Sequence, residues 1–236
     1  MIVFILSTVA AVLGGLAFLA GIFDRPKFIY REFLVESKKV LFILMAPCSK
    51  KGFNKHIPRL CEGTLDAIKV LKDSTKLLAD GAALYGAPEG AERLSVGLYF
   101  DDPKLTDTPR FAIGWVVGAK DFAEAKAMAE TANKMKPAKL QETIVAVRVG
   151  PGPGLAGRLP WRTIFTPMLA PMIMWTRAFA AYNEGGYKSH GRDGEEGAVA
   201  CEVYVTGPND SYEYIDYIVL MGDTKNVWDD AFPVEK

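Results

Sequence analysis

The run LSVGLYF at residues 94–100 ends in Asp101-Asp102-Pro103, and the run FAIGWVVG at residues 111–118 follows after a short polar stretch. Both runs are rich in β-branched and aromatic residues. The aspartates and the proline that close the first run are typical of turns. The sequence therefore predicts two consecutive strands separated by a turn. The elements on either side of these strands determine the fold class.

Upstream of these strands, the sequence predicts another strand and a helix. The uninterrupted apolar run at residues 40–46 ends at a proline, as expected of a strand that is buried on both faces. Between residues 58 and 80 the apolar side chains recur at helical spacing, with Asp80-Gly81 as the end signal. Residues 40–118 therefore have the predicted order β-α-β-β.

The second half of the chain repeats this order. Residues 144–149 form another apolar run, the Pro/Gly-rich stretch 150–157 is a predicted loop, and the apolar segment 160–182 is a predicted helix. Two predicted strands follow, at residues 200–205 and 212–221. The order β-α-β-β thus occurs twice, although no repeat is visible at the level of single residues.

The predicted fold class is α+β, with a duplicated β-α-β-β domain of pseudo-twofold symmetry over residues 40–222. Its halves, about 40–118 and 144–222, are joined by an alanine- and charge-rich surface helix at residues 121–135. Residues 223–236 are a predicted short C-terminal tail.

The first 23 residues carry no charged side chain. As a helix they would span about 35 Å, enough to cross a hydrocarbon core of about 30 Å, so they predict a transmembrane anchor. The alternative is a cleaved signal peptide, but no basic residues precede the apolar run. Basic residues follow the run, and the positive-inside rule therefore places the domain in the cytoplasm. Residues 24–39 are a predicted juxtamembrane linker, with a short strand at residues 28–33.

Composition argues against several functions. The 28 basic and 28 acidic residues cancel, so we expect no direct nucleic-acid binding. Three cysteines far apart in sequence fit a reducing compartment, and two isolated histidines lack metal-site spacing, so we expect neither a metal nor a cofactor. Residues 152–157 match GxGxxG, yet nearby prolines remove amide hydrogens that a phosphate cradle needs. No spacing predicts catalytic residues.

A ligand-binding cleft is predicted between the two halves, where helices meet the sheet. Its candidate lining combines aromatic rings with one carboxylate: Tyr99, Trp115, Trp161, Trp175, Glu202 and Tyr204. Glu202 is the most telling of these, because a carboxylate that alternates with Cys201 and Val203 along a strand faces either solvent or the cleft. Such a cleft suits a flat, apolar or cationic organic ligand. The alternative is a solvent-facing Glu202 with aromatic rings that fill the core.

Several of these motifs resemble the gyrase-inhibitory-protein-like (GyrI-like) domain. The first half carries LYG at residues 84–86 and then the two strand runs at 94–103 and 111–118. The second half carries LPWRTI at residues 159–164 and EVY at residues 202–204. Some GyrI-like proteins use a cleft glutamate and aromatic residues on reactive ligands. This resemblance therefore implies a membrane-tethered small-molecule-binding protein or hydrolase as one function.

With an anchor in front, the arrangement resembles the testis-expressed protein 264 family. The resemblance implies an endoplasmic-reticulum anchor, a cytosolic GyrI-like domain, and an adaptor that recruits the autophagy machinery and the valosin-containing-protein unfoldase. Receptor members then carry a long acidic tail with an aromatic-x-x-aliphatic motif. Here the sequence ends at Lys236, and the matching residues 212–215 lie in a predicted strand. We expect a non-enzymatic single-pass membrane adaptor, with the small-molecule binder or hydrolase as the alternative.

Overall fold

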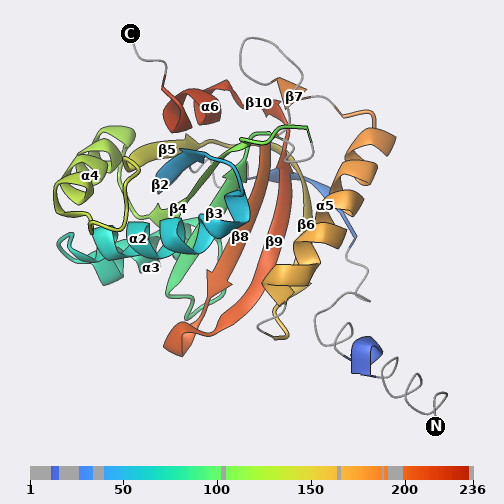
Figure 1. Ribbon diagram of the computed structural model, residues 1–236, viewed down its shortest axis with the longest axis horizontal. Coiled ribbons are helices and arrows are strands. Elements are labelled where there is room, and N and C mark those ends of the chain that lie inside the picture. Colours follow the sequence, from blue (N-terminus) through green and yellow to red (C-terminus); the bar gives the residue numbers. More distant parts are fainter. Residues whose placement is uncertain are drawn as a thin grey trace.

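The structure is a computed structural model that combines strands and helices along the whole of its described part (Figure 1). The description that follows covers residues 12–15, 27–33, 40–101, 105–163, 166–187, 189–190 and 199–233.

Eight strands form one antiparallel sheet. Their order across the sheet is β1 (Ile29–Phe33), β6 (Gly152–Pro160), β9 (Tyr212–Leu220), β8 (Val199–Thr206), β3 (Arg93–Tyr99), β4 (Arg110–Val117), β2 (Leu41–Ser49) and β5 (Val145–Val149). A separate two-stranded parallel pair joins β7 (Ser189–His190) to β10 (Gly222–Asp223). The predicted α+β class is confirmed.

Two β-α-β-β units occupy matching positions in the sheet. The first is β2, α2 (Ile57–Lys69) with α3 (Ser74–Tyr85), β3 and β4; the second is β6, α5 (Thr166–Glu184), β8 and β9. Their third elements, β3 and β8, pair at the centre of the sheet. The strand that precedes each unit pairs with the other unit, because β1 adds to β6 and β5 adds to β2. The two units therefore share strands at both edges.

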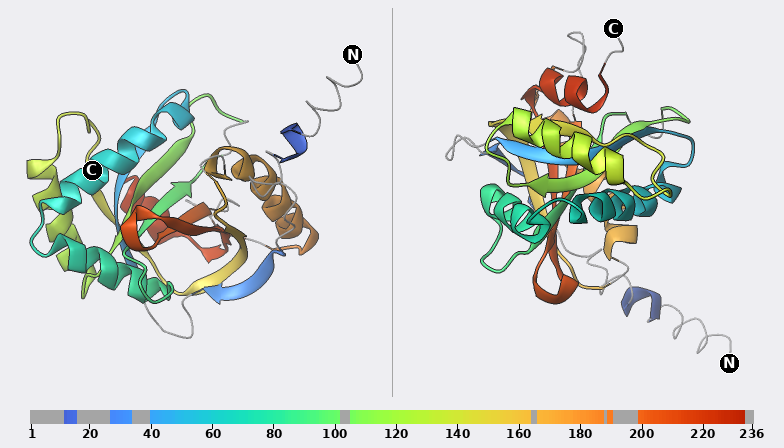
Figure 2. Two further views of the ribbon diagram at one scale, coloured as in Figure 1. Left: turned by 90° about the horizontal axis from the view of Figure 1, so that it is seen from below. Right: turned by 90° about the vertical axis from the view of Figure 1, so that its left-hand side faces the viewer.

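Helices cover both faces of the sheet. One face packs Leu44, Phe111 and Trp115 against α2, α3 and α4 (Phe122–Met135). On the same face, α5 covers the second unit. Figure 2 shows that α5 lies to one side of the central strands and that α2, α3 and α4 lie to the other side. The opposite face packs against α6 (Lys225–Ala231), which buries Val227 and Trp228. We call the face covered by α2, α3, α4 and α5 the helical face. Between α5 and the other three helices, the middle of this face is occupied by side chains of β3, β8 and β9.

The predicted loop at residues 150–157 is wrong, because residues 152–160 form β6. Pairing with β9 on one side and β1 on the other supplies the hydrogen bonds that composition alone does not suggest. Strand β6, and not residues 144–149, is therefore the first strand of the second unit. Residues 145–149 do form a strand, but it extends the first unit as β5.

The predicted single helix at residues 58–80 is two helices. The helix is interrupted between Lys69 and Ser74, where Asp73 adopts a left-handed conformation with φ of 56°. The expected stop signal at Gly81 lies inside α3. A Cβ at this position would be only 2.7 Å from the carbonyl oxygen of Val116. Gly81 thus allows α3 to pack closely on β4 and does not end the helix.

At the two ends of the chain, the sequence predicts an anchor with a linker and a short C-terminal tail. The predicted anchor at residues 1–23 lies outside the described residues, except for residues 12–15, which are helical. Within the described part of the chain, no helix has both the length and the hydrophobicity to cross a bilayer. In the predicted linker, β1 occupies residues 29–33. In the predicted tail, α6 packs on the sheet.

Candidate functional site

Glu202 lies at the middle of the sheet and faces its helical side. Its neighbours across the sheet are Gly97 on β3 and Tyr217 on β9. Glu202 is only 2% exposed. The alternative of a solvent-facing Glu202 is therefore wrong, and the residue is a buried carboxylate under α5.

Three aromatic side chains donate hydrogen bonds to this carboxylate. The Tyr99 hydroxyl donates to Oε2 at 2.9 Å, and the Tyr204 hydroxyl donates to the same oxygen at 2.7 Å. The indole Nε1 of Trp175, on α5, donates to Oε1 at 2.7 Å. Both carboxylate oxygens are thus bonded, and β3, β8 and α5 each supply one donor. We call Glu202, Tyr99, Trp175 and Tyr204 the carboxylate cage.

Within the described part of the chain, no cation balances the charge of Glu202. Burial raises the pKa of Glu202, and the hydrogen bonds from Tyr204, Trp175 and Tyr99 oppose this shift in part. Burial and the adjacent Glu202 also raise the pKa values of Tyr99 and Tyr204, which keeps both hydroxyls protonated as donors. Among the described residues, no Lys, Arg or His forms an ion pair with Glu202.

Two residues that the sequence analysis missed complete the cage. Gly97 leaves room for the Tyr99 phenol, since a Cβ at Gly97 would lie 2.9 Å from the Tyr99 hydroxyl. Tyr217 is fully buried, its ring lies edge-on to Trp175 at 5.4 Å, and its hydroxyl has no hydrogen-bond partner within the described residues. Only the register of β3, β8 and β9 reveals these neighbours, and the sequence does not show that register.

The remaining predicted lining residues divide between two places. Trp161 lies beside the cage, edge-on to Tyr204 at 6.5 Å and stacked on Tyr212 at 4.3 Å. Trp115 lies away from it, 3% exposed in the core under α2, where its Nε1 donates to the carbonyl oxygen of Cys61 at 3.0 Å. The structure therefore does not bring Trp115 together with the other predicted lining residues. Trp115 has the same sheet face as the cage but the other unit's helices above it.

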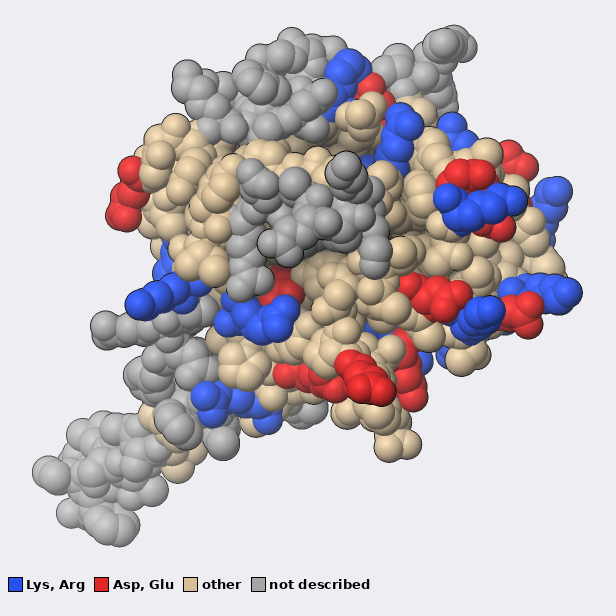
Figure 3. All heavy atoms as spheres, turned by 180° about the vertical axis from the view of Figure 1, so that it is seen from behind, with Lys and Arg blue, Asp and Glu red and all other residues tan. Residues whose placement is uncertain are grey.

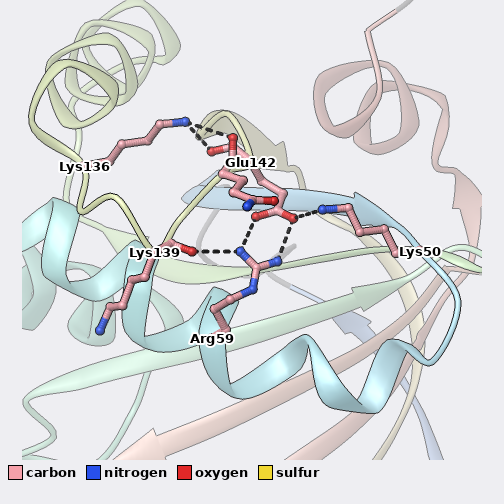
Figure 4. A network of polar contacts seen from close by, with 6 residues as sticks. Lys50, Arg59, Lys136, Lys139 and Glu142 are labelled. Atoms are coloured by element: carbon pink, nitrogen blue, oxygen red, sulfur yellow. Dashed lines mark hydrogen bonds and ion pairs between the residues drawn. The ribbon is translucent and has the colours of Figure 1, made fainter.

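A second carboxylate, Glu142, is half-buried and has a different environment (Figure 4). Arg59 donates to both of its oxygens at 2.7 Å, and Lys50 donates to Oε1 at 2.8 Å. The Lys136 ammonium donates to the main-chain carbonyl of Glu142 at 2.7 Å. The bonds from Arg59 first, and then from Lys50, lower the pKa of Glu142 to about 2. This network, which we call the Glu142 clamp, ties α2 and the end of β2 to the segment before β5.

The described residues offer no metal site and show mixed surface charge. They contain no group of three His, Cys, Asp or Glu side chains that could hold a metal ion. On the face seen in Figure 3, basic and acidic side chains are interspersed among the coloured residues. The chemistry of the carboxylate cage is therefore that of one acidic group, neutral hydrogen-bond donors and aromatic rings.

Comparison with known proteins gives a distant likeness only. No protein-family model matches the chain, and no curated protein matches it by sequence. Among solved structures, an uncharacterized conserved protein from Listeria innocua aligns with a TM-score of 0.44, and two structures titled as hydrolases from the same organism align at 0.41 and 0.42. Each is 12% identical and covers 83% of this chain and 91% of its own.

Proposed function

We propose that this protein binds a small organic cation at the carboxylate cage. The observation that carries the proposal is a buried carboxylate held by three neutral donors, with no cationic side chain paired to it among the described residues. Leaving a buried charge without a counter-ion is costly, and a bound cation would remove that cost. The aromatic rings around Glu202 add the surfaces on which such a cation is attracted.

Binding of a cation would be linked to the protonation of Glu202. Burial raises the pKa of this carboxyl, and a cation favours the ionised form, so binding should release a proton over part of the acid range. Affinity should accordingly rise with pH until the carboxyl is fully ionised. The same site would also serve a hydrolase, in which the Glu202 carboxylate acts as a general base for a water molecule beside the bound ligand.

The test is titration of the full chain in detergent with tetramethylammonium, followed by tryptophan fluorescence at constant ionic strength. We expect saturable binding by the wild type and a loss of more than about tenfold in affinity in Glu202→Gln, because the variant has no charge to pair. Glu130→Gln, on the exposed side of α4, is the matched control and should bind as the wild type does. Equal binding by wild type and Glu202→Gln would refute the proposal.

The same preparation tests the hydrolase. Acetylcholine combines an ester with a quaternary ammonium, and its hydrolysis consumes one water and releases acetate and choline. We expect acetate release that depends on Glu202 if the carboxylate activates water. If the protein binds the cation but acetate release does not depend on Glu202, the esterase activity is rejected and the binding function stands.

A membrane-anchored adaptor is the second candidate, favoured by the covered state of the cage. Glu202 is 2% exposed and both of its oxygens are bonded, so a ligand reaches this carboxylate only when the side chains of the cage move aside. The repeated β-α-β-β order supports a duplicated GyrI-like domain, and the resemblance to the testis-expressed protein 264 family supports an anchor in the endoplasmic-reticulum membrane. The proposed partners are the autophagy machinery and the valosin-containing-protein unfoldase.

Two experiments test the adaptor. Pulldown from detergent extract should recover these partners from the full chain and equally from Glu202→Gln, and recovery that requires Glu202 would contradict a ligand-independent adaptor. The glycosylation sequence Asn209-Asp210-Ser211 lies at the turn between β8 and β9, with Asn209 exposed. A cytosolic domain would stay unmodified there, so an endoglycosidase-sensitive gel shift would place the domain in the lumen instead.

A further inference from the structure

The two sides of the large sheet come together at one corner. Strand β5 is the edge strand on one side, and β6 is the second strand from the other side. In a flat sheet, six strand spacings, or about 29 Å, would separate β5 from β6. Only Gly150 and Pro151 lie between Val149 at the end of β5 and Gly152 at the start of β6. Three steps between consecutive Cα atoms reach at most about 11 Å, so the sheet is rolled until its two sides nearly meet.

A cavity of about 360 Å³ lies at this corner. Within the described sheet, β5 and β6 do not pair with each other, so no ladder of hydrogen bonds closes the roll. Helix α6 packs beside β5 and contributes to the wall of the cavity (Figure 1). We call this space the corner cavity. Its apolar walls come from strand ends, the β5–β6 turn and α6: Val40, Val149, Pro151, Leu220, Met221 and Val227.

The walls of the corner cavity are aliphatic. Val149, Leu220 and Val227 belong to the buried cluster between the sheet and α6, on the face opposite Glu202. No aromatic ring is among the described residues that line the cavity. Its volume lies within the range of small-molecule sites, which is about 300 to 1,000 Å³. The corner cavity therefore suits an aliphatic chain, and it is separate from the carboxylate cage.

Arg148 of β5 is the cationic side chain among the described lining residues. Its Nε lies 3.1 Å from Oδ2 of Asp230 on α6, and its guanidinium lies over the Phe122 ring at 4.6 Å. Nη2 donates to Oδ1 of Asn226 over a long distance, 3.4 Å, and within the described part of the chain Nη1 has no hydrogen-bond partner. Asp230 and Phe122 thus hold the guanidinium, and its outer fork of Nη1 and Nη2 is available to an acidic group.

We propose that the corner cavity binds a medium-chain aliphatic carboxylate. The acid group pairs with the outer fork of Arg148, and the chain lies along Val149, Leu220 and Val227. A planar guanidinium matches a carboxylate with two parallel hydrogen bonds, which are stronger than bonds between neutral groups. The aliphatic walls supply the apolar contacts of the chain. This site goes beyond the proposed cation binding and does not depend on Glu202.

The test is calorimetric titration of the full chain in phosphatidylcholine nanodiscs with octanoate, with empty nanodiscs as the lipid background. We expect saturable binding by the wild type. Octanol has the same chain length without a charge and should bind more than about tenfold more weakly. In Arg148→Met the affinity for octanoate should fall more than about tenfold, because the variant keeps an apolar side chain but has no charge.

Lys126→Met is the matched control. The Lys126 ammonium lies over the same Phe122 ring at 4.5 Å, but Lys126 does not line the cavity. This variant should bind octanoate as the wild type does. Asp230→Asn removes the carboxylate that competes for Arg148, so it should bind octanoate several-fold tighter. A gain in affinity separates this effect from a loss of stability, and it keeps the proposal testable if Arg148→Met does not fold.

Gly152→Leu tests the apolar part of the cavity. A Cβ at Gly152 meets only the carbonyl oxygen of Met221, at 3.9 Å, so a leucine side chain there has room to fill the cavity. This variant should fold and lose octanoate binding. In the wild type, affinity should rise roughly threefold for each methylene from butanoate to octanoate.

Three results would overturn the proposal. Equal binding of octanoate by the wild type and Arg148→Met, or equal affinity for octanol and octanoate, would show that no acid group is recognised at Arg148. Octanoate binding that survives in Gly152→Leu would place the chain outside the corner cavity. A titration of the wild type that matches empty nanodiscs would show that there is no site.

Discussion

Glu142 is a half-buried carboxylate and Glu202 a buried one, and their surroundings shift the two pKa values in opposite directions. The Glu142 clamp surrounds its carboxylate with the cationic side chains of Arg59 and Lys50, and the pKa of Glu142 falls to about 2. The carboxylate cage offers Glu202 only neutral donors, and its pKa rises because burial outweighs their hydrogen bonds. The paired carboxylate joins segments of the fold, whereas the proposed function gives the unpaired one a bound cation as its partner.

The largest expected effect comes from removal of the cation in the clamp. Arg59→Ala leaves Glu142 with only Lys50 and a side chain that is 7% exposed, so we expect a loss of about 3 kcal/mol in the free energy of unfolding at neutral pH. Urea denaturation measures this loss. Lys139→Ala removes an exposed pair with Asp66 and should leave the free energy of unfolding nearly unchanged. Equal costs would show that the clamp is not a buried charge pair.

Acid should weaken the clamp in a defined pH range. Glu142 has a folded pKa of about 2 and an ordinary value of 4.5, so its stabilisation is present above pH 4.5 and is lost as the pH falls toward 2. The two values correspond to about 3 kcal/mol. Thermal denaturation from pH 5 downward should show this loss in the wild type and not in Glu142→Gln. Parallel pH curves for the two proteins would contradict the assignment.

Glu202 should behave in the reverse sense. Its raised pKa means that the folded state keeps the proton at a pH where the unfolded chain has lost it, so the contribution of this group to stability declines as pH rises above 4.5. Glu202→Gln removes that decline and should be more stable than the wild type at neutral pH, because no charge is desolvated. The Gln amide can donate to the Tyr99 and Tyr204 hydroxyls while its oxygen accepts from Trp175. A destabilised variant would show that the ionised carboxylate is already compensated.

The smallest expected effect is at the edge of the cage. A methyl group at Gly97 would stand 2.9 Å from the Tyr99 hydroxyl and force the phenol away from Glu202, with a cost of about 1 kcal/mol for one hydrogen bond. Gly97→Ala should also weaken tetramethylammonium binding. Gly150→Ala is the control, since nothing lies within 4 Å of a Cβ there. Unchanged binding in Gly97→Ala would remove Tyr99 from the site.

The predictability of the two sites differs for physical reasons. The cage was visible in part because Glu202 and Tyr204 share one strand, and a carboxylate between apolar neighbours is unusual. The sequence could not separate Trp115 from the cage, because strand alternation gives the face of the sheet but not the helix above it. The clamp left no sequence signal, since Arg59 and Glu142 are 83 positions apart. Strand β6 was missed because its glycines and prolines resemble a loop, although one of those glycines seats Phe28.

The most direct test of the unpaired charge at Glu202 is calorimetric titration with tetramethylammonium in two buffers of different ionisation enthalpy, repeated across the acid range. The account predicts that binding releases a proton below the pKa of Glu202, that affinity rises with pH, and that both effects are absent in Glu202→Gln. Binding without proton release at every pH, or equal binding by the variant, would contradict it.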